Sequence, residues 1–189
     1  VVKADVSKED QVIQMFDTVE SLFGMPPSGL VNNAGILGKQ TNDISQLSPQ
    51  DLDEIFATNV YGPFHCCKEF IQRTSSTSGG KGGSIVNVSS GSAYIGYPLV
   101  YAMSKAALDS MTTGLVASSA EQGIRINSVA PGVTETDMVS PDKLEATIPN
   151  IPMKRAGKPS EIAESIVFLL SDASSYTSGA KIRISGGRP

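Results

Sequence analysis

Short apolar runs alternate with longer amphipathic stretches along this chain, and the pattern predicts strands separated by helices. Runs with the composition or the alternation of strands lie at 1–4, 29–32, 84–89, 124–129 and 181–184. One helix is expected between a cap signal that begins with Ser7 and the terminating Gly24. Apolar residues at helical spacing predict further helices at 49–56, 61–73, 99–121 and 159–171, the first of them capped by Ser48.

This order of elements predicts an α/β fold, a doubly wound parallel sheet with helices on both faces. A length of 189 residues fits one domain over 1–189. Residues 133–158 form an unusually long connection between a strand and a helix. Such connections are typical of substrate loops or lids, and we expect a short helix within 137–146.

Composition narrows the possible partners. The net charge is −4 with no basic cluster, so neither nucleic acid nor a membrane surface is expected as a partner. Cys66 and Cys67 are adjacent on a predicted helix and would point in different directions. Without a disulfide framework, the cytoplasm is the expected location. His65 is the only histidine, so no metal site is expected.

Tyr101 and Lys105 lie four residues apart in the longest predicted helix, so their side chains share one face. A lysine ammonium favours the phenolate, and we expect it to lower the pKa of Tyr101 from about 10 towards neutrality. Such a tyrosine can act as a general acid or base. Chance alone gives roughly 0.26 such pairs in this composition, and two surface residues would look the same.

Other polar motifs surround this pair in a definite order along the chain. They are Asn33-Ala34-Gly35, Asn59, Ser89-Ser90 and Pro131-Gly132-Val133-Thr134-Glu135-Thr136. Three of them follow predicted strands, so a parallel sheet would bring them to one edge. The ordered set resembles the short-chain dehydrogenase/reductase family of NAD(P)-dependent oxidoreductases, from Ala4 to Gly187.

The resemblance implies a catalytic group of Asn59, Ser90, Tyr101 and Lys105. Tyr101 would exchange a proton with an alcohol or ketone oxygen, and Lys105 would lower its pKa and contact the nicotinamide ribose. Ser90 would hold the substrate oxygen, with Ser89 as the alternative. Asn59 would hold a water in a proton relay to Lys105, although it could be a helix-end or turn asparagine.

The resemblance also implies contacts with NAD or NADP, which this sequence does not distinguish. The expected cofactor-binding residues are Asp5, Val6, Asn33, Ala34, Gly35, Tyr101, Lys105, Pro131, Gly132, Thr134 and Thr136. Asp5 could equally help to start the next helix. Besides Ser90, the expected substrate contacts are Tyr94, Tyr97, Leu99 and Met138.

The family pattern also opens with a glycine-rich phosphate loop, which this sequence does not contain. We therefore expect the run at 1–4 to be the third strand of the complete fold, with two βα units missing before it. The resemblance further implies a homo-oligomer, a tetramer or a dimer. Three alternatives stay open: a non-catalytic cofactor-binding or scaffold protein, an epimerase or dehydratase, and an inactive truncated fragment.

Overall fold

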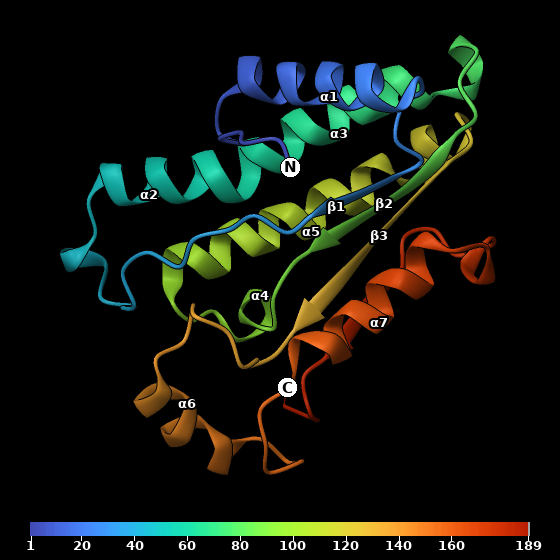
Figure 1. Ribbon diagram of the computed structural model, residues 1–189. Helices are drawn as coiled ribbons and strands as arrows, with labels where there is room; N and C mark the ends of the chain where they lie inside the picture. Colours follow the sequence, from blue (N-terminus) through green and yellow to red (C-terminus); the bar gives the residue numbers. More distant parts are fainter. Residues whose placement is uncertain (189) are drawn as a thin grey trace.

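The computed structural model describes residues 1–188, and at its centre lies a four-stranded parallel sheet (Figure 1). Its spatial order follows the sequence: β1 (Gly29–Asn32), β2 (Gly83–Val88), β3 (Ile124–Pro131) and β4 (Lys181–Ile184). Parallel neighbours need crossover connections, and the helices supply them. The predicted α/β fold with a parallel sheet is confirmed.

Helices cover both faces of the sheet, as the doubly wound prediction requires (Figure 1). One face carries α1 (Glu9–Phe23), α3 (Gly62–Thr74) and α5 (Leu99–Ala120), and the other carries α7 (Pro159–Leu170). Alternation along β2 explains this division. Ile85 packs with the α1 and α3 side chains, whereas the next residue, Val86, packs with those of α7.

Two helix starts show where local sequence signals succeed and fail. Ser48 and Asp51 form a reciprocal capping box at the start of α2 (Pro49–Phe56), as predicted. Ser7 does not cap α1, because Lys8 occupies that position and makes no side-chain cap. The Ser7 hydroxyl instead donates to the Asp5 carboxylate over 2.8 Å. Gly24 ends α1 in the left-handed conformation, as expected.

The predicted strand at residues 1–4 is wrong for the described structure. These residues have no strand hydrogen bonds, and β1 pairs only with β2 among residues 1–188. An extended segment becomes a strand only where a neighbour completes its backbone ladder. Composition alone could not supply that neighbour.

Three features between the main elements shape the site. A π-helical turn, Ala57–Tyr61, joins α2 to α3 and was not predicted. The short helix α4 (Ser92–Ile95) was also missed. By contrast, α6 (Pro141–Thr147) lies in the long connection and extends one residue beyond the predicted 137–146.

Among residues 1–188, no helix is both long and apolar enough to cross a bilayer.

Arg125 on β3 anchors the C-terminal end of α7. Its guanidinium donates to the carbonyls of Leu169, Leu170 and Ser171 over 2.8, 3.4 and 3.2 Å. Carbonyls in the last turn of a helix have no partner within the helix, so a planar fork with several donors suits this place. Arg125 also donates to the Ser174 hydroxyl over 3.0 Å.

Replacing Arg125 with Met is expected to lower the free energy of unfolding by about 2 kcal/mol. Leu170 O loses its side-chain donor, and Leu169 O and Ser171 O keep only hydroxyl donors in place of a charged one. Urea denaturation measures the change. Arg125→Lys keeps the charge without the fork and should show an intermediate loss. Lys81→Met is the control at an exposed position. Equal midpoints for Arg125→Met and Lys81→Met would contradict this anchoring role.

Candidate active site

The candidate residues that follow β1, β2 and β3 meet at the carboxyl ends of these strands, beside the first turns of α5. Backbone hydrogen bonds join the loops that leave these strands. Gly91 N donates to Pro131 O over 2.8 Å, which ties the loop after β2 to the end of β3. Lys105 Nζ donates to Val88 O over 2.8 Å, which ties α5 to the end of β2. The expected convergence of these motifs at one sheet edge is therefore present.

Tyr101 and Lys105 are both buried on one face of α5, with 8% and 3% of their surfaces exposed. The Lys105 Nζ lies 5.6 Å from the centre of the Tyr101 ring. Burial lowers the pKa of Lys105 to about 8, since an ammonium loses its hydration in the interior. At neutral pH the ammonium form still predominates.

The expected lowering of the Tyr101 pKa is wrong for this structure. Burial raises the pKa of Tyr101, and a hydrogen bond with the Ser90 hydroxyl offsets only part of that rise. The Lys105 ammonium lies over the ring but donates its hydrogen bond to Val88 O, so it does not offset the effect of burial on the phenol. Tyr101 therefore carries its proton at neutral pH, as a general acid must.

The two serines at the end of β2 have different surroundings. Ser89 is buried, and its hydroxyl donates to Lys105 O over 3.3 Å. Ser90 is only partly buried, lies beside Tyr101, and accepts from Ser92 N over 3.1 Å. Because Ser90 has room for a ligand and Ser89 does not, the geometry favours Ser90 for contact with substrate.

Asn59 lies in the π-helical turn and is fully buried. Its amide oxygen accepts from Ile36 N over 2.8 Å, and its amide nitrogen donates to Ile36 O over 2.9 Å and to Ser104 Oγ over 3.0 Å. Ser104 Oγ in turn donates to Tyr101 O over 2.7 Å. Both amide hydrogens are used, so the side chain joins the loop after β1 to α5 and is not free to donate to water.

The loop after β1 brings Gly35 directly against the catalytic candidates. A side-chain carbon at Gly35 would lie 3.3 Å from Asn59 Oδ1 and 3.4 Å from Lys105 Nζ. This closeness explains glycine here, because a larger residue would press on both groups. Asn33 and Ala34 precede it and are exposed at the strand end, where a ligand can reach them.

Asp5 and Val6 lie before α1, away from these contacts. The Asp5 carboxylate accepts from the hydroxyl and the backbone N of Ser7, and these bonds lower its pKa. Asp5 O also accepts from Lys8 N over 3.0 Å, so this residue does shape the start of the helix. Val6 packs against Gly62 at the start of α3.

The candidate residues after β3 begin a loop that stays close to the sheet. Gly132 N donates to Ile184 O of β4 over 2.9 Å, and Thr134 Oγ1 donates to Gly132 O over 3.1 Å. Thr134 is partly buried, whereas Thr136 is exposed and its hydroxyl is available to a ligand. Pro131 ends β3 at the same edge as Ser90.

The expected substrate contacts divide into two groups. Met138 is exposed, and Tyr97 donates its hydroxyl to Gln40 O over 3.0 Å, in the loops near the site. Leu99 N donates to Thr41 O, which holds the same two loops together. Tyr94 lies elsewhere: its ring stacks under the Arg183 guanidinium at 4.8 Å, and its hydroxyl faces Asp109. Its place beside the substrate stays a prediction.

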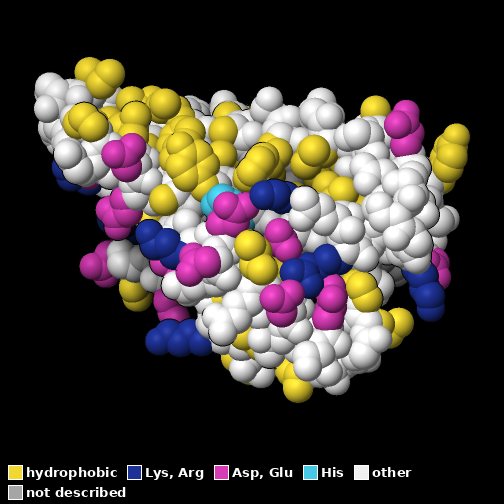
Figure 2. Space-filling view, turned by 90° about the horizontal axis from the view of Figure 1, so that it is seen from above, with side chains coloured by type: hydrophobic (Ala, Val, Ile, Leu, Met, Phe, Trp, Pro, Cys, Tyr) yellow, Lys and Arg dark blue, Asp and Glu magenta, His cyan; other side chains and the backbone are white. Residues whose placement is uncertain are grey.

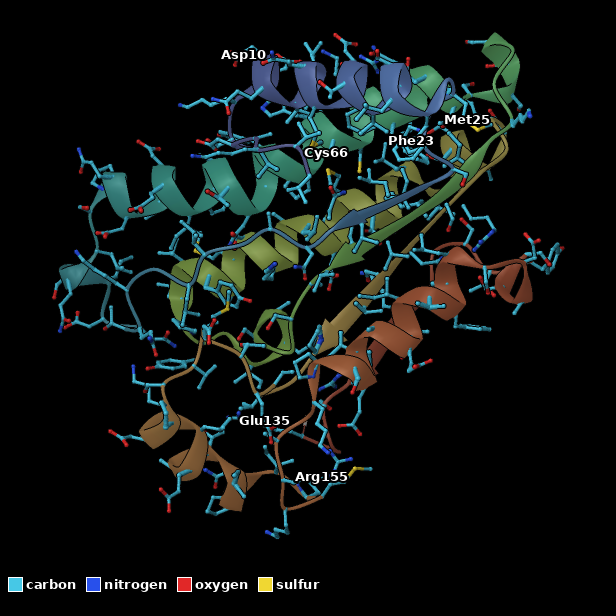
Figure 3. The ribbon with its side chains drawn as sticks, in the orientation of Figure 1. Asp10, Phe23, Met25, Cys66, Glu135 and Arg155 are labelled. Carbon is cyan, nitrogen blue, oxygen red and sulfur yellow. The ribbon has the colours of Figure 1, made fainter. Side chains whose placement is uncertain are left out.

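Residues 133–158 run from the end of β3 to the start of α7, and their two ends lie side by side. A backbone bridge pairs Thr134 with Gly157, and Glu135 N donates to Gly157 O over 2.9 Å. Away from this base, Lys143 on α6 donates to Gln40 Oε1 over 2.8 Å. Figure 3 shows Glu135 and Arg155 near the two ends of the segment. Its geometry suits a cover over the strand ends, and its role as a lid stays a prediction.

Sequence reasoning missed Ile36, Gln40, Ser104 and Asp109, which complete these contacts. Ser104 had a usable signal, because it lies between Tyr101 and Lys105 on the same predicted helix. Ile36 and Gln40 had none, since they contribute backbone groups or a polar side chain from a loop.

The described residues form neither a metal site nor a disulfide. No group of three or more potential metal ligands occurs among residues 1–188. His65 lies on the face made by α1 and α3, beside Glu9 and Lys68 (Figure 2). Cys66 and Cys67 are free and buried, and burial raises the pKa of their thiols to about 11 and about 12.

Comparison with known proteins places the whole described chain in one group. A protein-family model described as enoyl-(acyl carrier protein) reductase matches residues 1–188. An uncharacterized oxidoreductase, YgfF of Escherichia coli (strain K12), is 43% identical over 195 residues, which cover 100% of this chain and 78% of that protein. A glucose and ribitol dehydrogenase homolog of Oryza sativa subsp. japonica is 36% identical, covering 98% and 65%.

A solved structure gives the same relationship in three dimensions. The 3-ketoacyl-(acyl-carrier-protein) reductase of Brucella melitensis, complexed with NADH, is 32% identical, with a TM-score of 0.92. The match covers 99% of this chain and 77% of that one. The chain thus spans 65% to 78% of the length of these three proteins.

Proposed function

The chain belongs to the short-chain dehydrogenase/reductase family, and we propose that it is an oxidoreductase that transfers a hydride between NAD(P)(H) and an alcohol or ketone. The observation that carries this proposal is the buried pair Tyr101 and Lys105 on one face of α5, with the Ser90 hydroxyl beside the phenol. A buried acid with a hydroxyl neighbour and a nearby cation suits proton exchange with a carbonyl oxygen.

A nicotinamide cofactor, NAD or NADP, would supply or accept the hydride when bound. The residues present fit such a group, because the backbone of Gly35 approaches Lys105 Nζ and Asn59 without an intervening side chain. Lys105 and the residues after β1 and β3 would hold it: Asn33, Ala34, Gly35, Pro131, Gly132, Thr134 and Thr136. We assign Asp5 and Val6 to its outer end.

Each catalytic side chain would have a separate task in ketone reduction. The partly buried Ser90 hydroxyl would hold the carbonyl oxygen. Tyr101, whose pKa is raised by burial, would donate its phenolic proton to that oxygen. Lys105 would place a positive charge beside the phenolate that forms. Asn59 would hold the loop after β1 against α5, and thereby fix the distance between Gly35 and Tyr101.

We further propose a small-molecule substrate that lies under residues 133–158, with Met138 and Tyr97 near it. We also propose a homo-oligomer, a dimer or a tetramer, because Tyr61, Phe64 and Met103 leave large apolar side chains exposed near α3 and α5. Two free cysteines suit a reducing compartment, and we place the protein in the cytoplasm on that ground.

The test is a coenzyme assay on the full-length protein with a broad panel of ketones, aldehydes and alcohols. Oxidation of NADH or NADPH that depends on both a carbonyl substrate and Tyr101 would support the proposal. Binding of NAD(P)H without turnover of any substrate would favour a cofactor-binding scaffold instead. Retained cofactor with product formation but no net coenzyme turnover would favour an epimerase or dehydratase.

A further inference from the structure

Asp109 is a buried carboxylate that the proposed reaction does not use. It lies one turn beyond Lys105 on α5 and exposes only 6% of its surface. Ser128 Oγ on β3 donates to Asp109 Oδ1 over 3.3 Å. Among residues 1–188, no cationic side chain comes within 4.0 Å of this carboxylate. A buried carboxylate without a close ion pair is costly, which calls for a reason for its presence.

Lys105 is a buried cation on the same helix, and no carboxylate of residues 1–188 lies within ion-pair distance of it. Lys105 is 3% exposed, and its ammonium donates to a neutral carbonyl, Val88 O. Residues four apart on a helix are neighbours on its surface, so Asp109 and Lys105 lie on the same side of α5. Burial lowers the pKa of Lys105, and the negative charge of Asp109 raises it in part. The charge of Asp109 therefore favours the ammonium form of Lys105.

The other groups that face this pair come from four neighbouring elements. From α4, Tyr94 faces Asp109, and from β4, Lys181 and Arg183 lie close by, Arg183 over the Tyr94 ring. Asp109 also borders an open groove of about 500 Å³, which Tyr94 and Lys181 line. Ser128 from β3 and Asn59 from the π-helical turn do not titrate, and Tyr101 is the remaining titratable neighbour on α5.

We propose that Asp109 is a positioning residue whose carboxylate keeps Lys105 in its ammonium form beside Tyr101. This assignment rests on the proposed function for its catalytic meaning, since Lys105 must be charged to stabilise a Tyr101 phenolate. Asp109 itself acts through Lys105, one turn away along the helix. Lys181 of β4 lines the same groove as Asp109, and Arg183 lies over the Tyr94 ring.

The test compares three variants of the full-length protein with the wild type. Asp109→Asn removes the charge but keeps an oxygen that accepts from Ser128. Asp109→Glu keeps the charge, and Asp53→Asn makes the same change at an exposed site on α2. The amino group of Lys105 is titrated by NMR of protein labelled at the lysine Cε, with Lys105→Met used to assign its signal. The pH profile of kcat/KM is measured in parallel.

In Asp109→Asn we expect the Lys105 titration midpoint to fall by about one pH unit. From a starting value of about 8, this leaves about a fivefold smaller ammonium fraction at pH 8. The alkaline limb of kcat/KM should move by the same amount. Asp109→Glu and Asp53→Asn should each show the Lys105 midpoint and the alkaline limb of kcat/KM of the wild type. If Asp109→Asn does not fold, Asp109→Ser replaces it, because its smaller side chain leaves space for water at the groove.

An unchanged Lys105 midpoint in the folded, charge-free variant would overturn the assignment, whatever the activity. The titration does not depend on turnover, so the two proposals can fail separately. A lowered midpoint in a protein that turns over no carbonyl substrate would retain Asp109 as the partner of Lys105 and refute the oxidoreductase function. Normal turnover of a carbonyl substrate with an unchanged Lys105 midpoint in Asp109→Asn would support the oxidoreductase function and refute the role of Asp109.

Discussion

Tyr101→Phe is expected to lower kcat by about two to four powers of ten while the protein stays folded and binds NAD(P)H as before. The change removes one oxygen from a buried side chain and leaves the ring that packs in the site. Phenylalanine cannot donate a proton to the substrate oxygen, so the reaction loses its general acid. Steady-state kinetics, with coenzyme binding followed by fluorescence, measures both quantities.

Tyr176→Phe is the matched control, because it makes the same chemical change on a fully exposed tyrosine. Its kcat should equal that of the wild type. Turnover by Tyr101→Phe within a few-fold of the control would refute proton transfer by Tyr101. A large loss of coenzyme affinity would instead show that the hydroxyl acts in binding, and the catalytic assignment would have to move to another group.

Asn59→Ala is expected to lower the free energy of unfolding by about 3 kcal/mol and to remove most of the activity. The substitution leaves Ile36 N and Ile36 O without their side-chain partner. It also removes the donor to the buried Ser104 hydroxyl, which still donates to Tyr101 O. The loop that carries Gly35 then loses its tie to α5. Urea denaturation gives the stability, and kcat/KM gives the activity.

The control is Asn42→Ala, at an exposed residue whose amide donates to Gly96 O over 3.0 Å. It should cost much less stability than Asn59→Ala. The pair of variants also separates two roles for Asn59. A side chain that only held a relay water could be removed with little effect on unfolding. Equal stability of the two variants with a loss of activity confined to Asn59→Ala would therefore favour the relay over the structural tie.

Local signals in the sequence were sufficient where the structure is determined locally. Ser48 and Asp51 lie three residues apart and cap α2 as predicted. The apolar run of β2 is buried on both faces, which its composition required. The signals failed where a distant group decides the outcome. Residues 1–4 lack a neighbouring strand, and a strand depends on one for its hydrogen bonds.

The same division holds within the candidate site. Helical spacing placed Tyr101 and Lys105 together, because that spacing is a local property of α5. It could not reveal that Lys105 would turn to Val88 O, or that burial would raise the pKa of Tyr101. It also could not reveal that the Tyr94 ring would lie under Arg183 of β4. Partners distant in sequence set these orientations.

The closed base of residues 133–158 has a consequence for how this protein could diversify. Because Thr134 pairs with Gly157, the two ends of the segment lie next to each other, as in an insertion with a single attachment. Doubling the length of a flexible loop costs only about 0.6 kcal/mol in closure entropy. Descendants of this chain could therefore exchange or lengthen the segment while β3 and α7 keep their packing. New substrate preferences could then arise by changes within residues 133–158, while the candidate residues on α5 and at the strand ends stay the same.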